Sequence, residues 1–261
     1  MGLPYNVGGP EWSNSWTAVP GGLKTKVGLA AASLDGALGI ETGIALALTG
    51  EAGNIHINYL DNGGWLGWNA VPGMHTKVGL CAAVSGGTLH LYAAGEDENV
   101  YYNSTTDGST WSRTWTQVPG AKTKTALCAG ADGSLYLVGL HGGVWVNPNP
   151  PAGDWTQLVI QGNAFHTEAG LCSVETFTAG EPPALFAKGQ DDEIWCCYPP
   201  DQGWSQLGSL GGSASLTYVG IAGVSLLNFF CCLFMTGRHN EIYFSDSYTG
   251  SLTPWTIHSR I

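Results

Sequence analysis

The sequence predicts an all-β protein that is built from repeated meanders of short strands. The segment from Ala184 to Gly212 contains one complete copy: an apolar strand, an acidic turn, a second strand at Ile194–Cys197, a loop rich in proline and glycine, and a strand that opens with Trp204. The same pattern recurs along the chain. The 39 glycines and 13 prolines also leave no uninterrupted window for a helix.

The spacing of the copies is typical of propeller blades. Five copies of the strand, turn and strand begin at Leu46, Leu91, Leu135, Leu185 and Leu233. The strand after each copy is marked by a tryptophan, and the six marker tryptophans are 40 to 52 residues apart: Trp16, Trp68, Trp115, Trp155, Trp204 and Trp255. A period of this size indicates a four-stranded blade. We therefore predict a single β-propeller of four-stranded antiparallel blades over residues 1–261.

The repeat boundaries predict five blades, with six as the alternative. The repeats cover approximately residues 16–67, 68–114, 115–154, 155–203 and 204–254. The chain begins and ends inside a repeat, which gives five inner-strand units and six outer-strand units. We expect residues 1–15 and 255–261 to close the ring together, so that no sheet edge stays open.

Composition and charge exclude several classes of partner. The net charge is −11 and only nine Lys or Arg are present, which argues against nucleic acid as a partner and against binding to anionic membranes. No apolar run reaches the length of a membrane span, so we predict no membrane insertion. The N-terminus has neither a basic start nor an apolar run. We therefore expect a cytoplasmic protein, or one that is released without a signal peptide.

The seven cysteines indicate small core residues more than a disulfide framework. Cys81, Cys128 and Cys172 occupy one repeat position, and equivalent positions in different blades would lie too far apart to bridge. We interpret them as reduced core residues. Within the adjacent pairs Cys196-Cys197 and Cys231-Cys232 the two side chains point to opposite sides of the sheet, so a single bridge between the pairs stays open.

No metal, cofactor or catalytic motif is present in the sequence. The seven histidines form no His-x-x-x-His pair, and there is no Cys-x-x-Cys. Glycosidases need a unique cluster of carboxylates, whereas most acids here recur at one repeat position, as at Glu51 and Glu96. The segment from Ser104 to Trp111 resembles the Asp box of sialidases, which is a structural turn in that family. We predict no enzyme activity.

Two recurring sets of polar and aromatic residues are candidates for binding. The first is a Thr-Lys motif that follows the marker tryptophans: Thr25, Lys26, His75, Thr76, Lys77, Thr123 and Lys124. A repeated salt bridge between these lysines and the acidic turns is an equal alternative to ligand contact. The second set lies on the third strands: Tyr101, Trp145, Trp195 and Tyr243, with Asn58, Asn103 and Asn147. Packing between sheets and turn closure are the structural alternatives for this set.

These residue types favour repeated small clefts for sugars. Aromatic faces stack on sugar rings, while amide, hydroxyl and ammonium groups bind the hydroxyls. Repetition converts weak affinity at single sites into avidity. We predict a multivalent, non-catalytic carbohydrate-binding lectin that recognises small saccharides or glycan termini in pockets between blades. A protein-interaction scaffold is the main alternative, and a glycosidase-like propeller is a weaker one.

The repeat also resembles that of known propeller lectins. The residues from Leu185 to Trp195, followed by those from Gln202 to Gly208, resemble the repeat of the Photorhabdus-type propeller lectins, and less closely that of the tectonin, tachylectin-2 and Psathyrella-type lectins. The resemblance implies sugar sites between blades for fucose, galactose, N-acetylglucosamine or methylated sugars, with a homo-oligomer left open. The third strands lack the Arg and Glu pair of the fungal fucose lectins.

Overall fold

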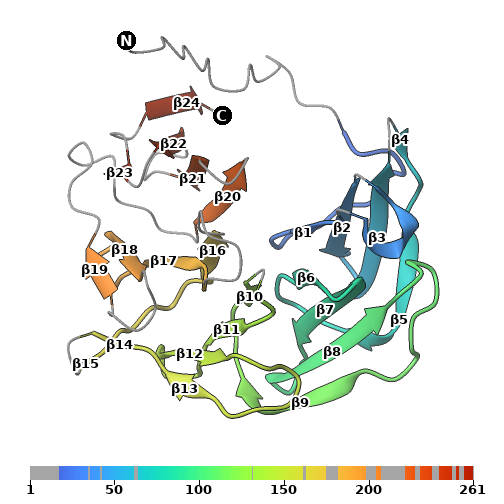
Figure 1. Cartoon of the computed structure of the whole chain (residues 1–261), viewed down its shortest axis with the longest axis horizontal. Coiled ribbons are helices and arrows are strands. Elements are labelled where there is room, and N and C mark those ends of the chain that lie inside the picture. The colour runs from blue at the N-terminus through green and yellow to red at the C-terminus, as the bar shows by residue number, and fades with distance from the viewer. Residues whose placement is uncertain are drawn as a thin grey trace.

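The computed structural model describes an all-β chain whose sheets are arranged around one axis (Figure 1). It describes residues 18–34, 36–41, 43–61, 64–130, 132–160, 163–174, 182–197, 204–206, 221–226, 230–236, 241–248, 251–252 and 256–260. Within these ranges there are five antiparallel sheets of four or five strands and one two-stranded ribbon. The prediction of an all-β propeller is confirmed.

Each of the five sheets is a meander formed by one continuous stretch of chain. The first sheet contains β1 (Ala30–Ser33), β2 (Gly43–Thr49), β3 (Asn54–Asp61), β4 (Gly64–Trp65) and β5 (Asn69–His75). The second contains β6 (Cys81–Ser85), β7 (Thr88–Ala94), β8 (Asn99–Thr105) and β9 (Thr116–Lys122). The third contains β10 (Cys128–Ala129), β11 (Leu135–Val138), β12 (Val144–Asn147) and β13 (Thr156–Gln157). A short 3-10 turn, η1 (Ala37–Gly39), connects β1 to β2.

The fourth and fifth sheets follow the same plan. The fourth contains β16 (Cys172–Val174), β17 (Ala184–Lys188), β18 (Ile194–Cys197) and β19 (Trp204–Gln206). The fifth contains β20 (Ala222–Leu226), β21 (Phe230–Thr236), β22 (Glu241–Tyr248), β23 (Ser251–Leu252) and β24 (Thr256–Arg260). The ribbon of β14 (Val159–Ile160) and β15 (Asn163–Ala164) lies between the third and fourth sheets in the chain. The meander predicted from Ala184 is thus β17, β18 and β19.

The last strand of each sheet begins at the marker tryptophan or directly after it, and we call it the outer strand. It pairs with the third strand of the same sheet. In the fifth sheet this outer strand is β24, from the chain's own last repeat. Residues 1–15, which were predicted to close the ring together with residues 255–261, lie outside the described part of the chain. Ring closure and the number of blades therefore stay predictions.

The innermost strands of the sheets surround a central cavity of about 1080 Å³. Its walls come from β1, β6, β10, β16 and the start of β20, which lie around the centre of Figure 1. The strands meet here because their inner residues are small: Ala30–Ser33 in β1 and Cys81–Ser85 in β6. Cys81 and Cys128 are buried free thiols, as predicted, and burial raises the pKa of Cys128 to about 12.

The turn between the second and third strands has one backbone design in four sheets. It opens with Gly50, Gly95, Gly139 or Gly189, and its fourth residue has a positive φ: 85° at Gly53, 66° at Glu98, 82° at Gly142 and 64° at Asp192. In three copies the carbonyl of that residue accepts a hydrogen bond from a Thr N–H further along the chain: Thr76 at 3.0 Å, Thr123 at 2.9 Å and Thr167 at 2.9 Å. In these three copies the turn therefore holds the segment that leads to the next sheet.

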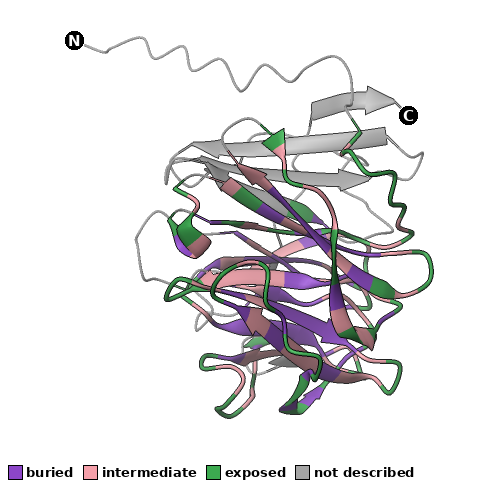
Figure 2. Cartoon of the chain, turned by 90° about the vertical axis from the view of Figure 1, so that its right-hand side faces the viewer, coloured by how far each residue is buried: buried purple, intermediate pink, exposed green. Residues whose placement is uncertain are grey.

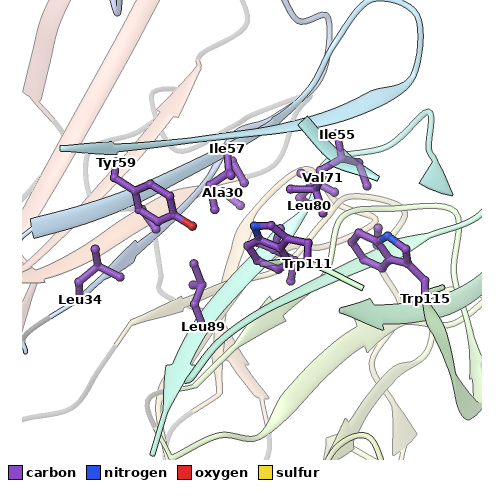
Figure 3. Packing of buried hydrophobic residues seen from close by; sticks show 14 residues of the cluster. Ala30, Leu34, Ile55, Ile57, Tyr59, Val71, Leu80, Leu89, Trp111 and Trp115 are labelled. Carbon is purple, nitrogen blue, oxygen red and sulfur yellow. The ribbon is translucent and has the colours of Figure 1, made fainter. Parts of the chain in front are cut away.

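Apolar side chains fill the spaces between neighbouring sheets. Figure 3 shows the cluster between the first and second sheets, where Ile55 and Ile57 of β3 meet Leu89 of β7 and two tryptophans, Trp111 and Trp115. Figure 2 shows that buried residues line the strand interiors, whereas exposed ones are concentrated in loops and turns. At about 25 cal/mol per Å² of apolar surface, such inter-sheet burial is the main term that stabilises the fold.

A tryptophan from one sheet also bonds to the outer strand of the sheet before it. The Nε1 atom of Trp115 donates to the carbonyl oxygen of Pro72 at 2.8 Å, and that of Trp155 donates to the carbonyl of Pro119 at 3.0 Å. These prolines lie in bulges, because the register between the third and outer strands shifts there. In these two copies, the proline of the recurring Val-Pro-Gly motif therefore supplies the carbonyl group that accepts a hydrogen bond from the next marker tryptophan.

The loop between β8 and β9 is organised around Asp107. Its carboxylate accepts hydrogen bonds from the hydroxyls of Thr105 (2.9 Å) and Thr110 (2.7 Å) and from the backbone N–H groups of Ser109 (2.9 Å) and Thr110 (2.7 Å). The Tyr59 hydroxyl of the first sheet donates to the Gly108 carbonyl at 2.8 Å. The segment that resembles an Asp box is thus a closed turn that also contacts the neighbouring sheet.

We expect the pH dependence of the protein's stability to reflect the hydrogen bonds that the Asp107 carboxylate accepts in this turn. The Thr110 hydroxyl, followed by the other donors, holds the pKa of Asp107 well below its ordinary value of 3.8. A lowered folded-state pKa means that the carboxylate stabilises the fold above that ordinary value and loses this effect as the pH falls toward the folded pKa. The difference in melting temperature between wild type and Asp107→Asn is expected to shrink below about pH 4. A difference that stays constant from pH 6 to pH 2.5 would contradict this assignment.

Candidate functional site

A cavity of about 530 Å³ lies beside the turn between the second and third strands of the first sheet. We call it the turn cavity. Two segments that each lead into a sheet also border it, and we call such segments links. Its walls are the link residues 26–27, the turn residues 49–53, the link residues 75–77 and Glu96 of the second sheet's turn. Four predicted residues lie together here: Lys26, His75, Thr76 and Lys77. The cavity therefore brings together parts of four segments that are separated in the sequence.

Two ion pairs border the turn cavity. Lys26 Nζ lies 3.8 Å from Glu51 Oε1, and Lys77 Nζ lies 3.0 Å from Glu96 Oε1. Both lysine side chains are 80% exposed. A third pair, Lys124 with Glu98 at 3.3 Å, occurs one link further on. The salt-bridge alternative for the Thr-Lys motif is thus observed, and the paired groups still face solvent.

Lys124 pairs with a carboxylate at a different turn position from the partners of Lys26 and Lys77. The position of Glu51 and Glu96 is taken in the third sheet by Leu140, which offers no charge. Lys124 therefore pairs with Glu98 of the preceding turn, whose carbonyl also accepts the Thr123 N–H. The charge pattern of the turn cavity is consequently not reproduced in the third sheet.

The threonines of the motif shape the link segments. Thr76 and Thr123 have no exposed surface, and their hydroxyls accept the backbone N–H two residues on, from Val78 (3.2 Å) and Thr125 (3.1 Å). Thr25 makes the same contact with Val27 at 3.2 Å. This is the local turn that Ser and Thr form through their own side chains. The hydroxyls stabilise the link and have no free surface for a ligand at Thr76 and Thr123.

His75 is exposed at the end of β5 and lies beside the turn. Its Nδ1 atom would be 3.6 Å from a Cβ placed on Gly53, which is an ordinary contact distance, so the imidazole lies beside the turn. The equivalent residue is Lys122 after the second sheet and His166 after the third. The His166 Nδ1 atom contacts the His141 carbonyl at 3.0 Å. A polar side chain therefore recurs beside the turn.

The third-strand aromatic residues are half-buried and pack against the inter-sheet clusters. Tyr101, Trp145 and Trp195 each contact a different cluster. Each ring also lies over the glycine that opens its own turn, because a Cβ on Gly95 would be 3.0 Å from the Tyr101 ring and one on Gly139 would be 3.1 Å from Trp145 Nε1. The packing alternative is thus observed for these three, and none lines the turn cavity.

Two of these rings also bond to acidic residues of their turns. The Tyr101 hydroxyl donates to Asp97 at 2.8 Å, and Trp195 Nε1 donates to Asp191 at 3.2 Å. Hydrogen bonds from Asn99 and Tyr101 lower the pKa of Asp97. Tyr243 lies in β22, of which the structure describes the backbone alone.

The predicted asparagines are buried at the ends of third strands, where they close loops. Asn58 accepts the Gly67 N–H at 2.9 Å, Asn103 donates to the Ser112 carbonyl at 2.7 Å, and Asn147 accepts the Asn149 N–H at 3.0 Å. The turn-closure alternative is therefore observed for all three. The strands run from the hairpin turn to this loop, so the asparagines lie at the opposite end of the sheets from the turn cavity.

The described residues also define what the site does not contain. Within them, no group of three or more His, Cys, Asp or Glu side chains could hold a metal ion. In the same part of the chain, no helix has the length and apolar character needed to span a membrane. The chemistry of the turn cavity is that of ammonium, imidazole, carboxylate and backbone groups.

Comparison with known proteins identifies the class of the fold. No protein-family model matches the sequence, and no curated protein matches it either. Among solved structures, the chain is similar to a fucose-specific lectin from Aleuria aurantia, with 17% identity, a TM-score of 0.59, and coverage of 89% of this chain and 78% of that one. An Aleuria aurantia lectin structure is described as a six-bladed β-propeller.

Two further solved structures show the same likeness. AofleA from Arthrobotrys oligospora is 15% identical with a TM-score of 0.60, over 89% of this chain and 72% of that one. The BP39L lectin from Burkholderia pseudomallei is 14% identical with a TM-score of 0.62, over 87% and 68%. Together with the radial sheets, these matches show that the chain has a β-propeller fold.

Proposed function

We propose that the protein is a multivalent, non-catalytic lectin that binds small saccharides or glycan termini. The turn cavity is the observation that carries this proposal. Its volume of about 530 Å³ lies within the roughly 300–1,000 Å³ that is usual for small-ligand sites. Lys26, Lys77 and His75 line it together with Glu51 and Glu96.

The paired charges suit sugar hydroxyls. An ammonium group only donates hydrogen bonds and a carboxylate only accepts them, whereas each hydroxyl does both. Two neighbouring hydroxyls can therefore bind Lys77 and Glu96, whose charged atoms are 3.0 Å apart. An exposed ion pair contributes only about 0–1 kcal/mol to stability, so exchanging part of it for a sugar costs little.

Repetition supports binding at more than one site. The parts of the turn cavity recur one sheet further on as Lys77, Glu96, Lys122 and Lys124. The next copy differs, because Leu140 and Glu168 replace an acid and a lysine. We propose two sites, of which the second has one more lysine and one acid fewer than the first, and weaker or altered sites in later repeats. Two sites on one rigid fold are sufficient for avidity toward clustered glycans.

The structural neighbours are consistent with this proposal, because they include fucose-specific lectins of the same fold. We propose fucosides, galactosides, N-acetylglucosamine and methylated sugars as the ligands to test first. The proposed location is the cytoplasm, or the exterior after release without a signal peptide. The proposal needs neither a cofactor nor catalysis.

Glycan-array and calorimetric measurements would test the proposal. Lys77→Ala and Glu96→Gln are each expected to weaken binding of the best glycan tenfold or more, which corresponds to about 1.4 kcal/mol. The unfolding free energy should change by less than about 1 kcal/mol, because the ion pair is exposed. Arg113→Ala is the matched control, since it removes one exposed cation that does not line the turn cavity.

Each other outcome points to a different function. Binding that is unaffected by both cavity variants would place the sugar site elsewhere on the propeller. An array without any bound glycan, together with capture of a specific protein, would favour an interaction scaffold. Turnover of a chromogenic glycoside would favour an enzyme.

A further inference from the structure

The residues that flank the buried threonine of each link change in charge from copy to copy. Thr76, Thr123 and Thr167 are at most 1% exposed, whereas the residues on either side of each are exposed. In an extended segment the two neighbours of a buried residue point together to the opposite side. Each link therefore presents a pair of side chains to solvent: His75 and Lys77, Lys122 and Lys124, and His166 and Glu168.

The backbone of the link that follows the second sheet is fixed at three points. Lys122 is the last residue of β9 and pairs with Asn99 of β8. The Thr123 N–H donates to the Glu98 carbonyl of the turn at 2.9 Å. The Thr125 N–H donates to the Thr123 hydroxyl at 3.1 Å. The side chains of Lys122 and Lys124 therefore leave from a held backbone beside the turn of the second sheet.

Lys122 differs from the neighbouring lysines in having no carboxylate partner within the described residues. Lys77 pairs with Glu96, and Lys124 pairs with Glu98. The ion pairs in the described part of the chain do not include Lys122. An ammonium group in this situation can receive a negatively charged ligand without first giving up an ion pair of its own.

The third acid of this turn, Asp97, is bonded to neutral donors. Its carboxylate accepts hydrogen bonds from the Tyr101 hydroxyl at 2.8 Å and from the Asn99 side-chain amide at 2.6 Å. It also accepts the Asn99 N–H at 3.2 Å. These donors belong to β8, the third strand of the same sheet, and they stabilise the carboxylate where it lies. The lysine ammonium groups nearby are left to Glu96, Glu98 and a ligand.

The turn cavity shows how a turn and its two links surround a space. Lys26 of the first link and His75 of the second both line that cavity. Lys77 and Lys122 occupy the same two repeat positions one sheet further on. We call the turn of the second sheet, together with its two links, the second turn site. It has an ammonium group where the turn cavity has an imidazole, and lysine is the stronger base of the two.

We propose that the second turn site prefers sugars that carry a carboxylate, and that Lys122 determines this preference. The inference rests on the lectin function proposed above and names the substrate class of one of its sites. The carboxylate of the sugar pairs with Lys122 Nζ, while two ring hydroxyls bind Lys77 and Glu96. Uronic acids and sialic acids are the sugars with this chemistry. The turn cavity, with His75 at this position, takes neutral sugars in preference.

Calorimetry with two matched pairs of ligands tests the proposal. The ligands are the methyl glycosides of galacturonic acid and of N-acetylneuraminic acid, each compared with its carboxyl methyl ester, which keeps the ring and removes the charge. We expect the wild type to bind at least one acid about fivefold more tightly than its ester, the upper end for an exposed charge pair. The acid that shows the preference distinguishes a uronic acid from a sialic acid.

Three variants assign the preference to Lys122. Lys122→Gln should bring the two affinities of a pair to within about a factor of two, because the unpaired charge is lost. Arg113→Gln, which removes an exposed cation outside the links, should leave the preference unchanged. Lys122→His gives the second turn site the residue type of the turn cavity and should also remove the preference. Measurements at about pH 8 keep the introduced imidazole neutral, since an ordinary imidazole titrates near about pH 6.5.

A swap between the two sites separates charge recognition from an effect on folding. The double variant Lys122→His with His75→Lys should regain the preference for the acid, now through the turn cavity. A purely structural role of Lys122 would not be restored by a change in the other link. Failure of the double variant to regain the preference would overturn the proposal.

Two further results would also overturn it: equal affinity of the wild type for acid and ester in both pairs, or a preference that persists in Lys122→Gln. These failures are distinguishable from failure of the lectin proposal. Neutral glycans and the two esters that bind in a manner dependent on Lys77 would support a lectin, even when neither acid binds more tightly than its ester.

Discussion

Replacing Trp115 with alanine is expected to lower the free energy of unfolding by about 3–5 kcal/mol, the range for a large aromatic side chain lost from a core. Trp115 is 7% exposed and packs in the cluster between the first and second sheets. Its Nε1 atom also donates to the Pro72 carbonyl of the preceding sheet. The substitution removes both the apolar contacts and this inter-sheet hydrogen bond. Urea denaturation followed by tryptophan fluorescence and circular dichroism would measure the loss.

Two further variants show which part of the side chain matters. Trp115→Phe keeps most of the apolar ring and removes the donor, so a smaller loss of about 1–2 kcal/mol is expected. Thr114→Ala, at an exposed neighbour, should change stability by no more than about 0.5 kcal/mol. A Trp115→Ala protein that is as stable as Thr114→Ala would show that the two sheets do not depend on this contact.

Gly73→Ala is expected to destabilise the fold by about 3 kcal/mol or more, through backbone strain combined with a clash. Gly73 has a φ of 89°, which side chains rarely tolerate, and it lies in the bulge of β5. A methyl group at this position would overlap the backbone carbonyl of Arg113 in the neighbouring sheet. Because the obstacle is main chain, it cannot move aside as a flexible side chain could. The melting temperature would measure the effect.

Gly86→Ala separates the clash from the strain. Gly86 has a φ of 55°, but a Cβ there would meet nothing within 4 Å. Only the conformational cost remains at this site, and we expect a loss of about 1 kcal/mol. Equal losses for the two variants would mean that the close approach of Arg113 contributes nothing to the effect at Gly73.

Much of the fold could be predicted from the sequence because each repeat carries strong local signals. The glycine that opens the turn and the tryptophan that opens the outer strand mark positions with few alternatives. The positive φ at Glu98 and Asp192 was not predictable, since residue type alone indicates glycine for that position, as at Gly53 and Gly142. The surrounding turn holds the backbone there regardless of side chain.

The candidate site was only partly predictable, because recurrence alone does not distinguish structure from binding. The Thr-Lys motif recurs for two reasons: the threonine shapes the link, while the lysine pairs with an acid of the turn. Sequence spacing could not show that Glu96 approaches a link that belongs to the first sheet. The asparagines recur because they close loops, and this signal looks the same in sequence as a binding signal.

The exposure of Leu29 was also beyond prediction from the sequence. Its repeat position reads as core in every copy, yet its side chain is 55% exposed. A pattern of residues describes what a position requires, whereas burial depends on which sheet lies beside it.

The prolines in the outer strands have a consequence for behaviour at high concentration. An outer strand with free backbone donors can template β-aggregation by accepting a strand from another molecule. Pro72 and Pro119 lack an N–H and lie where the register of β5 and β9 shifts, so a regular ladder cannot continue along these edges. The rim of these two sheets should therefore resist fibril growth, even though 44% of the residues are hydrophobic.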